Sequence, residues 1–301
     1  MLTVAVVGAG LMGRGIAEVF AGAGHPVRLH DVDADALRGT VDALRGTVDA
    51  LRGTVGGLRG LNGAVDGSTD LAEAVTGAGL VVEAVAENLD AKRELFARLD
   101  RLLPDALLAS NTSVLPVSSI AEHTARPERV VGTHWWNPPG LIPVVEVVRG
   151  KHTSEETMER TTALLTSLGK LPVRVERDVP GFVGNRLQHA LWREAIGLVA
   201  DGVCTAETVE TVVRNTIGLR LAAMGPLENA DYVGLDLTLA IHEAVLPDLN
   251  RSPSPSPLLS DLVAAGDLGA KSGRGFLSWP EGSRERAGAR LARHIARLTK
   301  P

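Results

Sequence analysis

Cysteine is nearly missing from this chain of 301 residues, in which Cys204 is the only one. A single cysteine excludes a disulfide within the chain and a zinc site built from several thiolates, and we predict no metal site. A fold without disulfides is typical of a reducing compartment. No charged segment followed by an apolar stretch and a cleavage site precedes the first predicted strand, so we expect a cytoplasmic protein.

Long apolar runs and an excess of positive charge are missing too. The longest apolar runs, such as residues 2–7 and 79–85, are far too short to span a bilayer, so we predict no membrane association. The net charge of -5 argues against binding to nucleic acid. The one basic cluster, between Arg284 and Lys300, has the spacing of the solvated face of a terminal helix, and a ligand site is the alternative.

What the sequence does contain is an alternation of strand-like and helix-like segments over residues 1–180. Apolar residues make up 45% and charged residues 22%, as in a globular protein with a core. Short apolar runs are typical of strands buried on both faces. The predicted strands are 3–7, 27–30, 80–85, 107–110, 130–134, 144–148 and 173–176, with helices such as 12–23 and 91–103 between them. This order predicts an α/β fold with a doubly wound, mainly parallel sheet of the Rossmann type.

The pattern changes after Pro180. Residues 182–202, 206–218, 232–246 and 257–265 show helical periodicity, and only 275–279 has the pattern of a strand. The segment 252–257 alternates serine and proline, which predicts a loop because proline interrupts helices. We therefore predict a Rossmann domain over residues 1–180 and a smaller, all-helical domain over residues 181–301.

Residues 35–59 repeat the unit Asp-Ala-Leu-Arg-Gly-Thr-Val. Leu37, Val41, Leu44 and their copies as far as Leu58 follow a 4-3-4-3 spacing, which is one apolar stripe along a helix. Each glycine of the repeat costs a helix about 1 kcal/mol relative to alanine, so packing must hold the helix. We predict that the stripe packs on its own protein, and a coiled coil with a partner is the alternative.

A glycine motif, Gly8-x-Gly10-x-x-Gly13, directly follows the first predicted strand and opens a helix. Such glycines permit a tight turn and a close approach of a pyrophosphate, and the helix N-terminus offers free N–H groups to the phosphates. Asp31 ends the second strand, where a carboxylate binds the adenosine ribose hydroxyls and repels a 2′-phosphate. The motif predicts NAD rather than NADP, and glycines that only pack the helix are the alternative. The predicted backbone contacts are Gly8, Gly10, Leu11, Met12 and Gly13.

His134 ends a predicted strand, and Glu146 lies in the next one. A turn of the chain between them would bring the two side chains together. A carboxylate on one imidazole nitrogen fixes the tautomer and stabilises the protonated ring, so that the other nitrogen can take a hydroxyl proton. The pair predicts acid–base catalysis, with a structural histidine as the alternative.

Seven motifs, in order along nearly the whole chain, resemble those of the L-3-hydroxyacyl-CoA dehydrogenase family. They are residues 8–13, 81–88 (Val-Val-Glu-Ala-Val-Ala-Glu-Asn), 110–113 (Ser-Asn-Thr-Ser), 134–138 (His-Trp-Trp-Asn-Pro), 180–186 (Pro-Gly-Phe-Val-Gly-Asn-Arg), 224–236 and 271–276 (Lys-Ser-Gly-Arg-Gly-Phe). The resemblance implies a Rossmann domain, an all-helical domain that forms a homodimer, NAD as cofactor and a role in fatty acid metabolism. It further implies that the enzyme interconverts L-3-hydroxyacyl and 3-ketoacyl small molecules, such as 3-hydroxybutyryl-CoA.

The resemblance also implies roles for single residues. His134 would be the catalytic base and acid, with Glu146 as its orienting partner. Ser113 and Asn185 would donate hydrogen bonds to the substrate oxygens. The implied contacts to the nicotinamide half of NAD are Glu87, Lys92, Asn137 and Lys271.

Two departures from the family concern the substrate. Trp135 and Trp136 stand where the family often has two phenylalanines, in a chain with only 3% aromatic residues. They are predicted either to shape the substrate pocket, with Trp135 as a contact, or to pack at the domain interface. The helical arm at 33–67 has arginines at seven-residue intervals but no lysine, which weakens the expectation of a coenzyme A thioester.

A second likeness, over residues 137–146, 185–190, 218–220 and 225–228, is to the lambda-crystallin, L-gulonate 3-dehydrogenase and carnitine dehydrogenase branch, whose enzymes oxidise free 3-hydroxy acids. Arg220 is then predicted to bind the substrate carboxylate through its planar guanidinium, or else to cap a helix. A free 3-hydroxy acid is thus the alternative substrate. A non-catalytic NAD-binding protein and a lysine-based dehydrogenase are the alternative functions.

The variant Asp31→Ala tests the ribose assignment. It removes the acceptor for the ribose hydroxyls of NAD and the repulsion of the 2′-phosphate of NADP. We expect the dissociation constant of NADPH divided by that of NADH to fall by about tenfold, which is the effect of losing one hydrogen bond to a charged group. Fluorescence titration measures both constants. An unchanged ratio would contradict the assignment.

Overall fold

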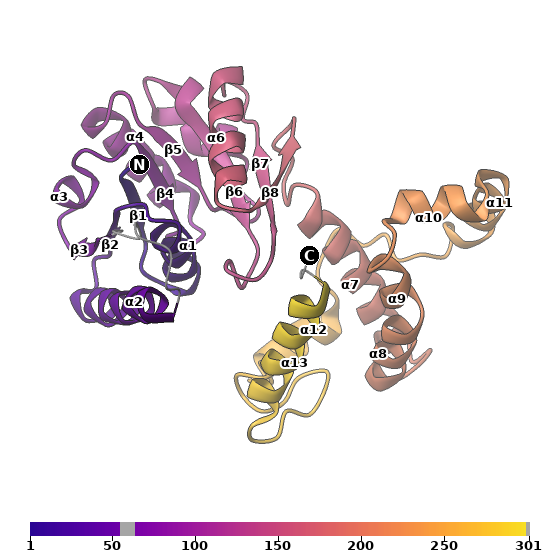
Figure 1. The fold of residues 1–301 in the computed structure, drawn as a ribbon. Coiled ribbons are helices and arrows are strands. Elements are labelled where there is room, and N and C mark those ends of the chain that lie inside the picture. The colour runs from indigo at the N-terminus through magenta and orange to yellow at the C-terminus, as the bar shows by residue number, and fades with distance from the viewer. Residues whose placement is uncertain (55–63, 299–301) are drawn as a thin grey trace. The chain divides into compact units, whose positions relative to one another are not determined.

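The computed structural model describes residues 1–54 and 64–298 (Figure 1). The contacts between its residues group the chain into two compact units. The first comprises residues 1–186 together with the residues from His294 onward, and the second comprises residues 187–293.

An eight-stranded sheet forms the centre of the first unit, in the order β3-β2-β1-β4-β5-β6-β7-β8. The strands are β1 (Val4–Val7), β2 (Val27–His30), β3 (Val65–Ser68), β4 (Leu80–Glu83), β5 (Leu107–Ser110), β6 (Val130–Trp135), β7 (Val144–Val148) and β8 (Leu171–Val175). Neighbouring strands are parallel except β6 and β7, which are antiparallel. The strand order reverses between β1 and β4, and sheets of this kind bind ligands at the carboxyl ends of the strands beside such a reversal.

Helices cover both faces of this sheet because the side chains of each strand alternate between the faces. Val4 and Val6 of β1 belong to one apolar cluster, and Ala5 and Val7 to the other. The first cluster includes residues of α1 (Leu11–Gly22), α2 (Ala34–Thr54) and α6 (Glu155–Ser167). The second includes residues of α3 (Leu71–Val75), α4 (Leu89–Leu102) and α5 (Val117–Ile120). The predicted doubly wound fold is confirmed.

One strand of the sheet was not predicted. β3 has the sequence Val-Asp-Gly-Ser and buries only Val65, so it shows neither an apolar run nor an alternation. It forms because its backbone pairs with β2, with Val65 opposite Val27. Strand pairing, and not the side-chain pattern, decides this element.

The first part of the seven-residue repeat forms α2, packed on its own chain as predicted. Leu37, Val41 and Leu44 are buried in the first apolar cluster. A Cβ atom on Gly67 of β3 would lie 2.9 Å from Val41 Cγ2 and 3.0 Å from Leu37 Cδ1, so the helix lies directly on the edge strand. Repeat residues 55–59 lie outside the described residues.

Helices make up most of the second unit. They are α7 (Gly184–Ala200), which begins in the first unit, α8 (Ala206–Asn215), α9 (Ile217–Leu221), α10 (Pro226–Val233), α11 (Leu235–Val245), α12 (Pro257–Ala264) and the greater part of α13 (Ser283–Leu298). The helix predicted over 232–246 is present as α11, and it begins only at Leu235 because Gly234, with φ of 102°, separates it from α10. The prediction of a strand over 275–279 is wrong. The backbone there forms only isolated bridges around Arg274, since Gly269 and Gly273 turn the chain with positive φ.

The second unit buries little apolar surface of its own. Between residues 187 and 293, all of which the structure describes, Gly197 is the only buried residue. Leu227 and Tyr232 are 81% and 79% exposed. No helix within the described ranges has the combined length and apolar character needed to cross a bilayer.

Candidate active site

His134 and Glu146 face each other across the one antiparallel strand pair of the described sheet. The register of β6 and β7 sets the two residues directly opposite. His134 Nδ1 lies 2.6 Å from Glu146 Oε2, and the two residues are 3% and 2% exposed. A hydrogen bond of this length to a carboxylate fixes the imidazole ring and its tautomer.

Both oxygens of Glu146 are bonded. Oε1 accepts hydrogen bonds from the backbone N–H groups of Val183 (3.0 Å) and Gly184 (3.1 Å) at the start of α7. Burial by itself raises the pKa of Glu146, but the bonds from His134, Gly184 and Val183 outweigh it and hold the pKa below its ordinary value. An ionised Glu146 accepts a hydrogen bond from the Nδ1–H group of His134. In the described parts of the chain, His134 Nε2 has no hydrogen-bond partner, so this atom is free to exchange a proton with a substrate.

Two aromatic rings pack on His134. The centroid of the Trp136 ring lies 4.9 Å from that of His134, and the centroid of Phe182 lies 5.8 Å away. Trp135, the predicted substrate contact, is only 3% exposed and packs against Phe20. Successive side chains of β6 point to opposite faces of the sheet, which places Trp135 in the core and leaves Trp136 beside the histidine.

A hydrogen bond from the Asn185 side chain to the Ser113 backbone brings these two residues together. Asn185 Nδ2 donates to the carbonyl oxygen of Ser113 at 2.9 Å. Glu87 Oε1 accepts from the backbone N–H groups of Ser113 (3.0 Å) and Val114 (3.2 Å) and from the Thr112 hydroxyl. Burial alone raises the pKa of Glu87, but the bonds from Thr112 and other donors hold it below its ordinary value. An ionised Glu87 therefore fixes the backbone at Ser113.

Lys92 is more deeply placed than its predicted role suggested. Its side chain is 1% exposed, and its ammonium lies 2.6 Å from Glu83 Oε1 and 3.2 Å from Glu87 Oε2. The other oxygen of Glu83 accepts from the Ser110 hydroxyl at 2.6 Å. The sequence analysis did not single out Glu83, although a second acid in the 81–88 motif was a signal. Lys92 thus forms an ion pair with Glu87, and a second ion pair with Glu83 fixes the position of Lys92.

Asn137 is exposed and lies in the connection between β6 and β7. Lys170, which the sequence analysis did not identify, donates from its ammonium to the carbonyl oxygens of Pro139 and Ile142 in this connection. A Cβ atom on Gly15 of α1 would lie 2.9 Å from the Pro139 ring. The connection is therefore held against α1, close to the glycine motif.

The glycine motif has the geometry of a phosphate-binding turn. Gly8 has φ of 104°, and a Cβ atom there would lie 2.6 Å from the Ala84 carbonyl oxygen. A Cβ atom on Gly13 would lie 1.8 Å from the Gly8 carbonyl oxygen, whereas one on Gly10 meets nothing within 4 Å. Gly10 is the N-cap residue of α1. Because glycine has no side chain, no side chain of the N-cap residue bonds to the first N–H groups of the helix, at residues 11–13. Open space and free donors at a helix N-terminus fit a dinucleotide pyrophosphate.

Asp31 follows β2 and belongs to the same carboxyl edge of the sheet. Its Oδ2 accepts from the backbone N–H of Ala9 at 2.8 Å, and its Oδ1 accepts from that of Asp33 at 3.0 Å. The carboxylate is thus tied to the glycine turn, and each oxygen keeps a lone pair for a further donor such as a ribose hydroxyl.

The remaining predicted contacts lie in the second unit. Arg220 is an exposed residue of α9, and Lys271 is an exposed residue of the turn before the bridges at Arg274. Their predicted roles stay predictions.

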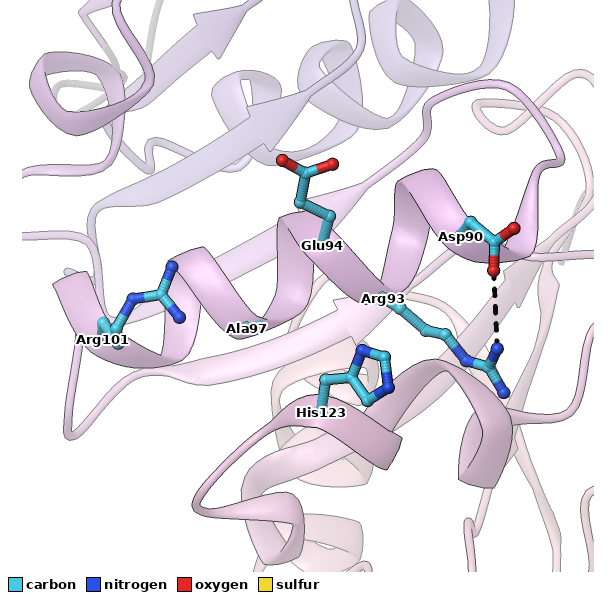
Figure 2. Close-up of a pocket in the computed structure, with 6 residues that line it drawn as sticks. All are labelled: Asp90, Arg93, Glu94, Ala97, Arg101 and His123. Atoms are coloured by element: carbon cyan, nitrogen blue, oxygen red, sulfur yellow. Dashed lines mark hydrogen bonds and ion pairs between the residues drawn. The ribbon is translucent and has the colours of Figure 1, made fainter.

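A surface hollow of about 350 Å³ lies on the outer side of α4 (Figure 2). Figure 2 shows Arg93 turned toward Asp90 and His123 facing the helix from η1 (Ala121–His123). The lining residues are Asp90, Arg93, Glu94, Ala97, Arg101 and His123. None of them belongs to the predicted site, and both signs of charge meet there.

The variants Gly10→Ala and Gly13→Ala are a matched test of the phosphate-binding turn. Gly10→Ala points its methyl group into space that a pyrophosphate would occupy, so the protein should keep its thermal midpoint and bind NADH at least about tenfold more weakly. Gly13→Ala forces its methyl group onto a backbone carbonyl, so it should lower the thermal midpoint as well. Thermal scans and fluorescence titration measure both effects, and full NADH affinity in Gly10→Ala would contradict the assignment.

Two sequence models of one family match adjacent parts of the chain. The model described as "3-hydroxyacyl-CoA dehydrogenase, NAD binding domain" matches residues 3–179. The model described as "3-hydroxyacyl-CoA dehydrogenase, C-terminal domain" matches residues 181–279.

Curated relatives and solved structures agree with this match. A probable 3-hydroxybutyryl-CoA dehydrogenase of Bacillus subtilis is 43% identical over 92% of this chain and 96% of its own. The 5-formyl-3-hydroxy-2-methylpyridine 4-carboxylate 5-dehydrogenase of Mesorhizobium japonicum is 36% identical over 97% of this chain and 96% of its own. A crystal structure of a 5-dehydrogenase for that pyridine carboxylic acid, described as an NAD⁺-dependent dismutase, has a TM-score of 0.90 at 35% identity and covers 99% of this chain and 97% of its own. The chain therefore belongs to the 3-hydroxyacyl-CoA dehydrogenase family, whose members use NAD to oxidise a CH–OH group.

Proposed function

We propose that this protein interconverts L-3-hydroxyacyl-CoA and 3-ketoacyl-CoA substrates, such as 3-hydroxybutyryl-CoA, with NAD. The observation that carries the proposal is the His134–Glu146 pair, buried and hydrogen-bonded at 2.6 Å in the same unit as the glycine turn. The identity of 43% with a probable 3-hydroxybutyryl-CoA dehydrogenase supports the thioester as substrate.

In this proposal His134 moves the proton. Its Nε2 takes the proton of the substrate 3-hydroxyl while the hydrogen on the same carbon leaves as hydride, so that the C–OH group becomes C=O. Bound NAD⁺ supplies the hydride acceptor. Glu146, held ionised by its three hydrogen bonds, stabilises the imidazolium that results. In the reverse direction the imidazolium returns the proton to the keto oxygen.

Ser113 and Asn185 are proposed to donate hydrogen bonds to the substrate oxygen that changes charge. Donors already fixed in place stabilise such a charge without reorganisation. The bond from Asn185 Nδ2 to the Ser113 carbonyl oxygen ties the two residues together, and Glu87 fixes the Ser113 backbone. We propose Trp136, which lies against His134, as the aromatic residue beside the substrate.

The variant His134→Gln tests this mechanism. We expect kcat with 3-hydroxybutyryl-CoA to fall at least about a hundredfold, the lower range for removing a general base. NADH binding should stay unchanged, because the glycine turn is intact. His123→Gln, which alters an exposed histidine of η1, is the control. Retained turnover in His134→Gln would dismiss the mechanism.

A free carboxylate substrate is the second candidate. Two arginines of α2 are already paired within the chain, Arg38 with Asp35 and Arg45 with Asp66 at 2.9 Å. Each arginine therefore has an acidic partner that competes with the phosphates of coenzyme A, and the solvent exposure of both pairs keeps this competition weak. The full-length relative that acts on a pyridine carboxylate also supports a substrate that carries its own carboxylate.

The variant Arg220→Ala separates the two candidates. If Arg220 binds a substrate carboxylate, its removal should raise KM for a free 3-hydroxy acid by about tenfold or more, the worth of a hydrogen bond between charged groups. The KM for 3-hydroxybutyryl-CoA should hardly change. A panel of both substrate types, followed by NADH absorbance, measures this. Activity of the wild-type protein with the thioester alone would remove the second candidate.

We further propose that a second copy of the chain covers the second unit. Residues 187–293 leave most of their large apolar side chains in solvent, and a helical unit needs a buried apolar face to be stable. A homodimer would supply the missing core. We propose residues 1–180 for the cofactor and residues 181–301 for the substrate and the dimer, and the boundary between the two family matches, which cover residues 3–179 and 181–279, supports a division near residue 180.

Light scattering after gel filtration tests whether the protein forms a homodimer. We expect a mass of about twice the 31.6 kDa of one chain. Leu227→Glu adds a charge to an exposed apolar side chain of α10 and should dissociate the dimer. Leu102→Glu, on α4 of the first unit, should not. A wild-type protein that elutes with the mass of one chain would overturn the proposal.

A further inference from the structure

The turn between β8 and α7 carries a residue with an unusual backbone. Phe182 has φ of 49°, the one positive value for a residue other than glycine in the described ranges. A bulky side chain in this region is strained and persists only where the surroundings hold it. The Phe182 N–H closes the turn with a bond of 3.0 Å to the Val179 carbonyl oxygen, and Gly181 before it also has positive φ.

This backbone conformation sets the direction of the next two N–H groups. Those of Val183 and Gly184 both point at Glu146 Oε1, at 3.0 and 3.1 Å. A Cβ atom on Gly184 would lie 2.2 Å from the Trp136 ring, so the backbone also lies directly against that ring. The turn therefore donates two hydrogen bonds to Glu146, and its backbone packs against the ring of Trp136.

The side chain of the same residue reaches the histidine. Phe182 is 1% exposed, and its ring centroid lies 5.8 Å from that of His134 at an interplanar angle of 57°. Its backbone thus aims the donors at Glu146 while its ring restrains His134. Phe96, in the same apolar cluster, is buried to the same degree, but the aromatic contacts found for the described residues do not pair it with His134.

We infer that Phe182 is a positioning residue that holds His134 and Glu146 in register, through its ring on the one and through the turn that it shapes on the other. The inference rests on the proton-transfer role proposed for the pair. A phenylalanine that only fills the core would affect stability. A positioning residue also affects the tautomer of the His134 imidazole. Its effect on kcat depends on the presence of Glu146.

A double-mutant cycle tests the coupling. Phe182→Leu keeps an apolar side chain and removes the ring. It should lower kcat about three- to tenfold, the range for one aromatic contact, with the KM for NAD unchanged. In the Glu146→Gln background, where the acid no longer braces the ring, the same change should lower kcat less than about twofold. Equal losses in both backgrounds would overturn the inference.

The tautomer gives a readout that does not need turnover. In the protein labelled with ¹⁵N-histidine, the two ring nitrogens of His134, assigned by the loss of their signals in His134→Gln, should report an Nδ1–H tautomer in the wild type. We expect Phe182→Leu to mix the two tautomers, and Phe96→Leu, the matched control, to leave them unmixed while lowering the thermal midpoint to a similar extent. An unchanged His134 spectrum in Phe182→Leu would overturn the inference, whether or not the protein oxidises 3-hydroxyacyl substrates. Should Phe182→Leu fail to fold, Phe182→Met, which also removes the ring and keeps an apolar side chain, gives the same two readings.

Discussion

The hydrogen bond between His134 and Glu146 is the interaction on which the rest of the site depends. The two residues are 12 positions apart in the chain, yet they are opposite each other because β6 and β7 pair in antiparallel fashion. A carboxylate buried to this extent is costly unless both of its oxygens accept hydrogen bonds. Glu146 meets that requirement with one imidazole and two backbone N–H groups. The chain thus keeps an acid ionised in an apolar environment, and the acid in turn decides which nitrogen of His134 faces outward.

A second charge network begins in the core at Glu83 and Lys92 and reaches the surface at Glu87. Glu83, Lys92 and Glu87 form a chain of ion pairs from the end of β4 to the backbone of Ser113. None of these groups moves easily, because each is bonded on more than one side. Ser113 and Asn185 are therefore held by bonds that start in the core of the sheet, and this rigidity suits the role proposed for them, the stabilisation of a changing charge.

The two units differ in how they bury apolar surface. The first has two continuous apolar clusters, one on each face of its sheet. The second places its large apolar residues mostly in solvent, and it does not build such a core from residues 187–293 alone. The relatives include a probable dehydrogenase for a coenzyme A thioester and a dehydrogenase for a pyridine carboxylate.

Local patterns in the sequence were sufficient to predict several features. The glycine turn, the apolar strands β1, β2 and β4 to β7, the helical stripe at Leu37 and the pairing of His134 with Glu146 all follow from spacing and residue type, and the motifs indicated the family. The remaining features depend on contacts between distant segments. β3 forms by pairing, Trp135 and Trp136 separate because a strand alternates its faces, Lys92 is buried between two acids, and Phe182 contacts the site through a backbone angle that no motif records. Local periodicity shows which faces are apolar. The contacts that hold the His134–Glu146 pair join segments distant in the chain, and these contacts exist only once the fold has brought the segments together.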